Sequence, residues 1–242
     1  MIVWKKVKKD YFKGRAENAF NSKEWLSIIS SRLKKNFKVK GNNDYLDQFI
    51  TSSPLPFLLI NDKKKEIKIS DFGGGSQEIF FLISKTQLKT KVIIDSVEVE
   101  NLVNFFKLKK FNKKNITIEF YKNFKFNKKY DYVHISDSLQ YLKDWKNFLN
   151  KLNKKKHKFI ILNNVPCGLN KTYLTKQRFY NKEIPNTFFS IRDIKKNLDN
   201  YNLIFKSLFL NKIRGKYTSY PQENFKFKDR INHPKTLIFK VK

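Results

Sequence analysis

The residues with the clearest chemical pattern are three consecutive glycines, Gly73, Gly74 and Gly75, which follow Asp71 at the end of a short apolar stretch. The segment 77–84 after them carries apolar residues at helical spacing, so the pattern predicts strand, glycine turn and helix. Glycine lets the backbone approach a ligand closely, and the free N–H groups of the new helix then face that ligand. This is the layout of a nucleotide-binding βα unit, although a plain tight turn is the alternative.

An acidic residue stands where such a unit needs one. Glu98 ends the β-branched segment 91–98, about 20 residues after the glycines, where an acid accepts hydrogen bonds from ribose hydroxyls. A surface acid is the alternative interpretation, and Asp95 is a rival that falls inside the predicted strand. The third glycine of the dinucleotide fingerprint would fall at Glu78, which disfavours a bound pyrophosphate. An adenosyl ligand without phosphates fits the pattern better.

Polar side chains also follow the later predicted strands. Ser136 and Asp137 come where the fourth strand should open into a crevice, and a capped helix start is their alternative role. The candidates for substrate contacts are Gln140, Tyr141, Asn163, Asn164, Gln177 and Arg178. Core packing is the alternative for Tyr141, and a solvated loop is the alternative for Gln177 and Arg178.

Strands and helices alternate along most of the chain. Strands are predicted over 66–72, 91–98, 116–120, 130–136 and 158–163, and helices over 77–84, 101–110 and 142–152. This alternation predicts an α/β sheet with helices on both faces. Towards the end of the chain we expect a helix over 190–201, a strand over 202–210, a long loop over 211–235 and a last strand over 236–241. With no helix between them, the two late strands can pair antiparallel at the sheet edge.

The N-terminal part is expected to be separate from this pattern. Residues 1–20 are basic and aromatic, and Asn21 is a candidate N-cap for a helix with an apolar stripe of Trp25, Ile28, Ile29 and Leu33. We interpret this helix as a lid or a flank, and we expect a second short helix over 44–50. The prediction is an N-terminal basic, helical extension over 1–60 and a main domain over 61–242.

Composition limits the class of protein. The 242 residues suffice for one sizeable core, and 40% hydrophobic residues argue against disorder. The net charge of +31 comes from lysines scattered in short pairs, as in an A/T-biased genome, and the basic surface favours anionic substrates or peripheral membrane contact. A single Cys167 excludes an internal disulfide, and from the hydropathy of the sequence we expect neither a signal peptide nor a spanning helix. We therefore expect a soluble, cytoplasmic protein without a metal.

At this point the chain resembles class I S-adenosylmethionine-dependent methyltransferases, through Asp71-Phe-Gly-Gly-Gly, Glu98 and the terminal strand pair. The resemblance covers about residues 65–242 and implies a Rossmann-like, seven-stranded, mostly parallel sheet that ends in an antiparallel pair. The segments 136–142 and 174–178 further resemble a bacterial group of methyltransferases associated with surface-polysaccharide genes. That group usually has a glycine where Gln77 stands, so Gln77 predicts crowding at the helix start and weaker cofactor binding.

The resemblance implies a role for each matching position. Asp71, Gly73 and Gly75 would contact the methionine end of S-adenosylmethionine, with Gly74 between them, and Glu98 would hold the ribose. Phe120 or its neighbour Glu119 would border the adenine. Ser136 and Asp137 would lie near the sulfonium.

Transfer of a methyl group from a sulfonium is an in-line displacement, so alignment of the reactants supplies most of the catalysis. A hydroxyl acceptor also needs a general base, for which Asp137 is the first candidate and His134 the second. His134 lies inside a strand, where core packing is the alternative role. We expect a small-molecule or glycan acceptor, methylated at oxygen.

Three other functions stay open. RNA methylation would explain the charge, although scattered lysines argue against it. A non-catalytic scaffold with this fold would explain Gln77. A nicotinamide reductase is the most distant of the three.

Overall fold

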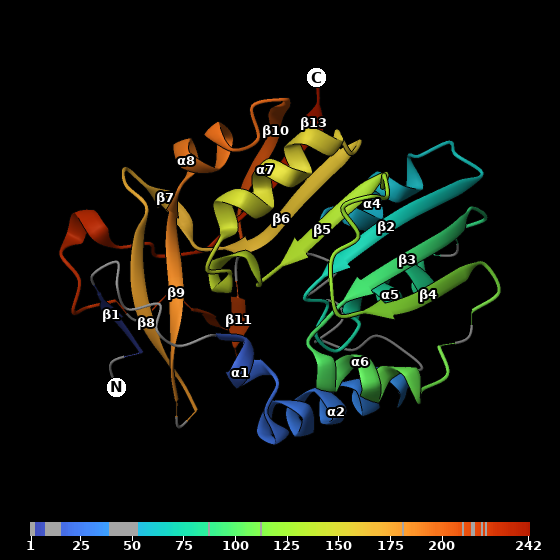
Figure 1. Ribbon diagram of the computed structural model, residues 1–242, viewed down its shortest axis with the longest axis horizontal. Coiled ribbons are helices and arrows are strands. Elements are labelled where there is room, and N and C mark those ends of the chain that lie inside the picture. The colour runs from blue at the N-terminus through green and yellow to red at the C-terminus, as the bar shows by residue number, and fades with distance from the viewer. Residues whose placement is uncertain are drawn as a thin grey trace.

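The computed structural model describes residues 3–7, 16–38, 53–86, 88–111, 113–180, 182–209, 211–213, 216–218, 220 and 222–242. A seven-stranded sheet forms its centre, and a four-stranded sheet lies beside it (Figure 1). The helix predicted over 44–50 lies outside the described residues. None of the described helices has the length and apolarity needed to cross a membrane.

The seven-stranded sheet confirms the predicted fold class. Its order is β10 (Tyr201–Leu208), β13 (Lys235–Val241), β6 (Phe159–Val165), β5 (Tyr132–Ser136), β2 (Glu66–Phe72), β3 (Lys91–Val97) and β4 (Ile116–Tyr121). The strands from β6 to β4 are parallel, and β13 pairs antiparallel with both β10 and β6. The two late strands therefore pair as expected, with β13 inside the sheet and β10 at its edge.

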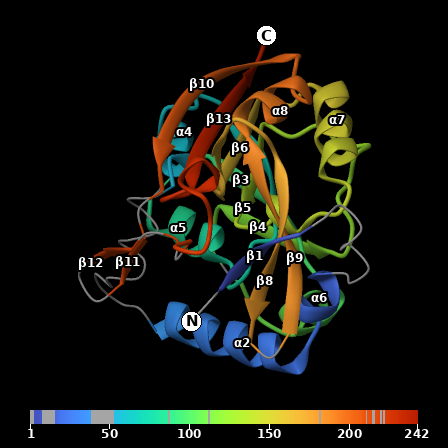
Figure 2. The same cartoon turned by 90° about the vertical axis from the view of Figure 1, so that its left-hand side faces the viewer.

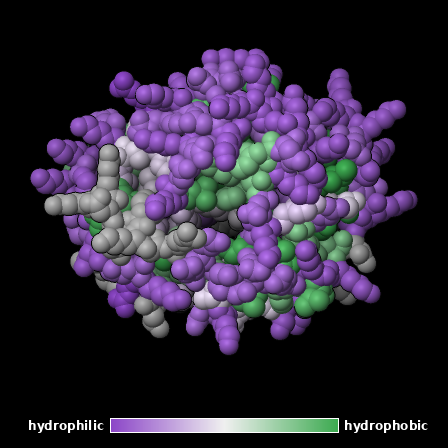
Figure 3. All heavy atoms as spheres, viewed as in Figure 1, coloured by the Kyte–Doolittle hydropathy of each residue, from purple (hydrophilic) through white to green (hydrophobic). Residues whose placement is uncertain are grey.

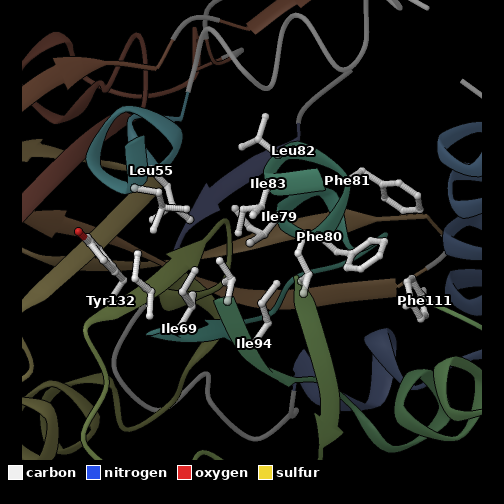
Figure 4. Packing of buried hydrophobic residues seen from close by; sticks show 14 of the residues in the cluster. Leu55, Ile69, Ile79, Phe80, Phe81, Leu82, Ile83, Ile94, Phe111 and Tyr132 are labelled. Atoms are coloured by element: carbon white, nitrogen blue, oxygen red, sulfur yellow. The ribbon is translucent and has the colours of Figure 1, made fainter. Parts of the chain in front are cut away.

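Two hydrophobic cores cover the two faces of this sheet. One face packs on α2 (Lys23–Lys38), α4 (Leu55–Ile60), α5 (Glu78–Lys85) and α6 (Glu100–Lys107). The other face packs on α7 (Trp145–Lys155) and α8 (Ile191–Lys196), with the 3₁₀ turn η2 (Leu139–Tyr141) at its end. Figure 4 shows Ile69 and Ile94 of the sheet beneath Ile79 and Ile83 of α5. Helix α5 is apolar almost all round because it packs on several neighbours at once.

The four-stranded sheet is absent from the sequence-based expectations. Its order is β1 (Trp4–Lys6), β8 (Tyr173–Phe179), β9 (Lys182–Ser190) and β7 (Cys167–Leu169). Residues 167–190 alternate too weakly between apolar and polar to predict strands, and β1 is only three residues long. Their pairing joins the N-terminal strand to a hairpin late in the chain, so the sheet depends on long-range contacts.

Two further expectations need correction. The segment 211–235, predicted to be a loop, contains a hairpin of β11 (Asn211–Ile213) and β12 (Lys216–Thr218) and a 3₁₀ turn η3 (Phe227–Asp229). The helix predicted over 190–201 ends at Lys196, and Tyr201 already belongs to β10.

The N-terminal helices α1 (Ala16–Phe20) and α2 form a cap below the sheets (Figures 1 and 2). Helix α2 begins at Lys23, where Ser22 Oγ accepts a hydrogen bond of 3.2 Å from the Trp25 N–H. Asn21 is bound to α6 instead, because its Oδ1 accepts from the Asn101 N–H at 2.9 Å and its carbonyl accepts from Asn101 Nδ2 at 2.6 Å. The boundary between residues 60 and 61 stays a prediction.

Candidate functional site

A cavity of about 1020 Å³ opens at the carboxyl ends of β2, β3, β4 and β5. Its floor is formed by the segments that follow those strands, and its cap is formed by α1, α2 and the hairpin β8–β9. Parallel strands gather their carboxyl ends at one edge of a sheet, where ligands bind in doubly wound folds. Figure 3 shows a largely hydrophilic face of the molecule with apolar residues gathered around a central hollow.

The three glycines form the tightest part of the floor. Gly73 and Gly75 have φ angles of +71° and +56°, in the left-handed region that favours glycine. A Cβ on Gly73 would lie 1.9 Å from Ser138 Oγ, and one on Gly74 would lie 2.2 Å from Asp71 Oδ2. A side chain at either position would therefore displace its neighbours. The loop is tied to β3 by the Gly73 N–H, which donates to the Val97 carbonyl at 2.9 Å.

Gln77 lies just behind this loop, at the N-cap of α5. Its φ of 63° is also left-handed, so it adopts a conformation that suits glycine better. The side chain is buried, and neither of its amide atoms has a hydrogen-bond partner in the described residues. Gln77 does not line the cavity. The expectation that Gln77 weakens cofactor binding stays a prediction.

Glu98 lines the cavity beside the glycines. The Gly75 N–H donates to its Oε1 at 2.5 Å. Burial raises the pKa of this carboxyl to about 8, and the Gly75 hydrogen bond opposes the shift while the nearby Asp71 and Glu78 carboxylates add to it. At neutral pH Glu98 is therefore mainly protonated when the cavity holds no ligand.

Asp71 and His134 form a buried pair at the same edge. Asp71 Oδ1 lies 2.8 Å from His134 Nδ1, and both side chains are almost fully enclosed. The adjacent strands β2 and β5 place them side by side in register. The second oxygen of Asp71 and His134 Nε2 have no hydrogen-bond partner within the described part of the chain. Both residues line the cavity, although these two atoms are themselves buried and the second oxygen of Asp71 lies against the Gly74 backbone.

Asp137 follows β5 and has the left-handed φ of 50°. Its side chain is exposed in the cavity, and desolvation by the protein atoms around the cavity raises the pKa of its carboxyl to about 7. Gln140 Nε2 donates to Asp137 Oδ1 at 2.5 Å, and Arg32 of α2 is close enough to favour the charged form. A carboxyl that titrates near neutrality suits a general base.

The other predicted contacts divide into two groups. Ser136, Tyr141 and Asn164 line the cavity. Asn163 is buried behind it, where it donates to Ser136 Oγ at 3.3 Å and accepts from Thr236 Oγ1 at 2.6 Å.

The remaining three substrate candidates do not line the cavity. Gln140 is buried and bonded to Asp137. Gln177 lies on β8 and accepts a hydrogen bond of 3.0 Å from the Tyr141 hydroxyl. Arg178 is exposed on the same strand. This strand pairs with β1, whereas a solvated loop was one of the expectations for Gln177 and Arg178.

Glu119 and Phe120 also lie away from the cavity. Glu119 is exposed and accepts a hydrogen bond from the Tyr121 hydroxyl, while the Phe120 ring packs in the core against Phe106 and Phe111. Strand β4 extends to Tyr121, and the cavity is lined by the residues after it, Lys122, Asn123 and Phe124. The predicted strand ended too early, so the expected adenine contacts fell short of the sheet edge.

The cap supplies cavity residues that the sequence analysis did not assign to the site. They are Ala16, Glu17 and Phe20 of α1, Trp25, Ile29 and Arg32 of α2, and Phe179 of β8. The apolar stripe of α2 was the available signal, and the cap fits its interpretation as a lid. The stripe alone could not show which of its residues face a ligand.

The charge of the cavity lining differs from that of the whole chain. Five carboxylic side chains line it against three basic ones, although the chain has 52 Lys and Arg and 21 Asp and Glu. The acids are Glu17, Asp71, Glu78, Glu98 and Asp137, and the bases are Arg32, Lys122 and Lys143. Among the described residues no cluster of His, Cys, Asp and Glu is arranged to hold a metal ion.

No protein-family model matches the sequence, and no curated protein matches it. Solved structures do share its fold. Magnesium protoporphyrin IX methyltransferase of Synechocystis PCC 6803 has a TM-score of 0.51 at 13% identity, covering 93% of this chain and 98% of that chain. A Burkholderia thailandensis 1,6-didemethyltoxoflavin-N1-methyltransferase has 0.50 at 10%, covering 90% and 89%. The cyclase SpnF has 0.53 at 8%, covering 93% and 94%. At these identities the likeness shows the fold alone, and that fold is found in both methyltransferases and a cyclase.

Proposed function

We propose that this protein binds S-adenosylmethionine and transfers its methyl group to an oxygen atom of a small acceptor. The observation that carries the proposal is the meeting of the glycine loop, Glu98 and Asp137 in one acid-lined cavity at the sheet edge. Ligand pockets of about 300–1,000 Å³ hold drug-sized molecules, so about 1020 Å³ leaves room for a nucleoside and an acceptor. Similar structures with bound S-adenosylhomocysteine, such as those of the porphyrin and toxoflavin methyltransferases, support this choice of cofactor.

The charge of the lining supports a cationic ligand. S-adenosylmethionine carries a sulfonium and an ammonium group, which carboxylates attract inside a cavity of low dielectric constant. A dinucleotide would instead bring a pyrophosphate close to the carboxylates of Asp71 and Glu78. The electrostatics thus favour the adenosyl ligand, as the absent third glycine does.

Each part of the floor has a proposed contact. Asp71 and the glycine loop would hold the methionine end, and Glu98 would hold the ribose hydroxyls. Ser136 and Asp137 would lie near the sulfonium. The residues after β4, from Lys122 to Phe124, take the place of Glu119 and Phe120 as the border of the adenine.

The proposed chemistry needs little beyond alignment and one base. The floor would hold the cofactor and the cap would hold the acceptor, so that the acceptor oxygen, the methyl carbon and the sulfur lie in line. Asp137 would accept the hydroxyl proton, since its pKa of about 7 keeps a useful fraction ionised at neutral pH. Gln140 would hold the Asp137 carboxyl in place.

The broader setting is not part of this proposal. A glycan acceptor and a role in surface-polysaccharide synthesis stay expectations from the sequence resemblance, and a cytoplasmic location stays an expectation from composition. Action on RNA is disfavoured, because α1 and α2 cover the cavity from which a base would have to be methylated.

Titration calorimetry with S-adenosylmethionine and S-adenosylhomocysteine tests the cofactor. We expect micromolar binding to the unaltered protein and loss of binding in Gly73→Arg and Glu98→Ala. Glu119→Ala is the matched control, since Glu119 is an exposed acid at the end of the neighbouring strand, outside the cavity, and its removal should leave affinity unchanged. No heat with either ligand from a folded protein would refute the proposal.

A further inference from the structure

Four aromatic side chains meet at the capped end of the cavity and all four line it. They are Phe20 of α1, Trp25 of α2, Tyr141 of η2 and Phe179 of β8, here called the aromatic wall. Phe20 is central, with ring centroids 4.9 Å from Tyr141, 5.1 Å from Phe179 and 5.4 Å from Trp25. Trp25 and Phe179 are 5.5 Å apart. The wall therefore joins four separate elements into one apolar surface.

The Tyr141 hydroxyl in the aromatic wall already has a hydrogen-bond partner. Tyr141 donates it to Gln177 Oε1 at 3.0 Å, and Asn186 Nδ2 donates to the same oxygen at 2.9 Å. Gln177 thus draws the Tyr141 hydroxyl towards β8. Because Phe20 and Phe179 have no polar atoms, the wall offers a ligand mostly ring surface and few hydrogen bonds.

Two charged groups lie at the border of the wall. The Asp137 carboxyl is near enough to Tyr141 to raise the pKa of its hydroxyl, after the larger effect of burial. The Arg32 guanidinium lies over the Trp25 ring, 5.8 Å from its centroid. The acceptor end thus combines an extended ring surface with one carboxyl at its edge.

This arrangement distinguishes between acceptor classes. A sugar carries a hydroxyl on nearly every ring carbon, and each one placed against the wall without a partner weakens binding. An aromatic ring has no such groups and makes offset or edge-to-face contacts with the wall. A single hydroxyl on that ring could meet Asp137 while the ring lies on the wall.

We propose that the acceptor is a planar aromatic compound with a ring hydroxyl, a phenol in the chemical sense, and this rests on the proposed function. Asp137 takes the phenolic proton as an oxygen electron pair forms the bond to the methyl carbon. The carbon–sulfur bond breaks and its electron pair stays on sulfur, so the sulfonium becomes a neutral thioether. The products are an aryl methyl ether, S-adenosylhomocysteine and a protonated Asp137.

The test compares 2-naphthol with decahydro-2-naphthol, which has the same carbon skeleton and hydroxyl without the flat ring. Methyl β-D-glucopyranoside represents the sugars. Binding is measured by calorimetry on protein saturated with S-adenosylhomocysteine. We expect 2-naphthol to bind at least about tenfold more tightly than either other compound, since each ring contact contributes roughly a threefold to tenfold gain in affinity.

Variants locate the binding. Phe179→Leu should weaken 2-naphthol binding about threefold to tenfold and leave S-adenosylhomocysteine binding unchanged. Phe20→Leu is a second variant with the same expectation, in case one of them unfolds. Phe205→Leu is the matched control, because Phe205 is an exposed aromatic residue of strand β10 and does not line the cavity.

The outcomes separate the two proposals. If S-adenosylhomocysteine does not bind the folded protein, the proposed function fails and this inference fails with it. If it binds, but the saturated alcohol or the glucoside binds as well as 2-naphthol, only the aromatic acceptor is refuted. An affinity for 2-naphthol that neither wall variant lowers would refute it too.

Discussion

The floor and the cap of the cavity are built in different ways. Each floor group lies near the carboxyl end of its strand or within a few residues after it, as Gly73 follows β2 and Glu98 follows β3. The cap brings together Phe20, Trp25 and Phe179 from opposite ends of the chain, and it is held by side-chain contacts. The floor is therefore specified largely by local sequence, whereas the cap depends on contacts between segments that are far apart in the chain.

The two regions also differ in chemistry. The floor presents carboxyls, backbone N–H groups and left-handed glycines, all suited to one polar, cationic ligand. The cap presents aromatic rings, the Arg32 guanidinium and the Glu17 carboxyl. This division places Asp137 at the boundary between the two regions.

Replacing Asp137 should have the largest effect, because it removes the group that connects floor and cap. We expect Asp137→Asn to lower kcat about 100- to 1,000-fold with a hydroxyl acceptor. In the unaltered protein kcat should rise with pH up to about 7 and then level off, since the base must be ionised. The variant should lose this rise, while its affinity for S-adenosylhomocysteine stays within about twofold.

The measurement is a pH profile of kcat for both proteins. Asp144→Asn is the matched control, as Asp144 is an exposed acid a few residues further along the chain and outside the cavity. An unchanged profile in Asp137→Asn would remove Asp137 from catalysis and would turn attention to His134.

Within the floor, Gly74 tests how closely the loop fits its surroundings. In Gly74→Ala the new Cβ would lie 2.2 Å from Asp71 Oδ2, so the buried Asp71–His134 pair must shift. We expect a loss of about 100-fold in cofactor affinity, equivalent to about 3 kcal/mol. Gly75→Ala is the control, because its Cβ finds nothing nearer than 3.7 Å and its cost is only the left-handed φ.

Calorimetry should then give the weaker binding for Gly74→Ala, with about tenfold loss or less for Gly75→Ala. Equal losses in the two variants would mean that backbone conformation, and not the close contact with Asp71, explains the glycine run.

The contrast between the regions also explains what the sequence could predict. Residues 66–76 show an apolar strand, a glycine run and a helix in one continuous segment, so the fold class and the floor were accessible from local pattern. Glu119 and Phe120 lie just before the residues that line the cavity. Their position was misjudged because the end of a strand is fixed by its pairing with the neighbouring strand. The Glu98 N–H bonds to the Tyr121 carbonyl, and no pattern within β4 reveals that bond.

The cap could not be predicted in the same way. Strand β1 is stable only because it pairs with β8, where Trp4 lies opposite Gln177. The stripe of α2 predicts a buried face but leaves its partner undefined. Sequence spacing carries no information on contacts between segments so far apart, so Phe20 and Phe179 gave no signal.

Glu98 should show the next largest effect, and it is measurable without any ligand. The pKa of its carboxyl in the folded protein is about 8, above its ordinary 4.5. Between these pH values the unfolded chain has lost a proton that the folded chain keeps, so the free energy of unfolding falls as pH rises from about 4.5 to about 8. Glu98→Gln removes this effect.

We therefore expect Glu98→Gln to gain stability relative to the unaltered protein between pH 5 and pH 9, on the order of 4 kcal/mol. Chemical denaturation at both pH values gives this difference. Glu119→Gln, an exposed acid, serves as the control and should show no such gain. A gain that is the same at pH 5 and pH 9 would contradict the raised pKa. The variant should also lose about tenfold in cofactor affinity, since one hydrogen-bond acceptor of the site is weakened.

The smallest expected effect concerns the contact between cap and floor. Asn36 of α2 is buried, and its Nδ2 donates to the Ser76 carbonyl at 3.2 Å, directly after the glycines. Asn36→Ala should cost about 1 kcal/mol of stability and speed cofactor release about fivefold, with little change in the association rate. Stopped-flow release of S-adenosylhomocysteine and chemical denaturation measure the two quantities.

Asn61→Ala is the matched control, because Asn61 makes a similar bond, from Nδ2 to the Phe57 carbonyl at 2.7 Å, on an exposed turn. If Asn36→Ala and Asn61→Ala release the ligand equally fast, the cap does not hold the glycine loop in place. The floor would then bind its cofactor independently of the cap, which is the arrangement that a locally specified floor allows.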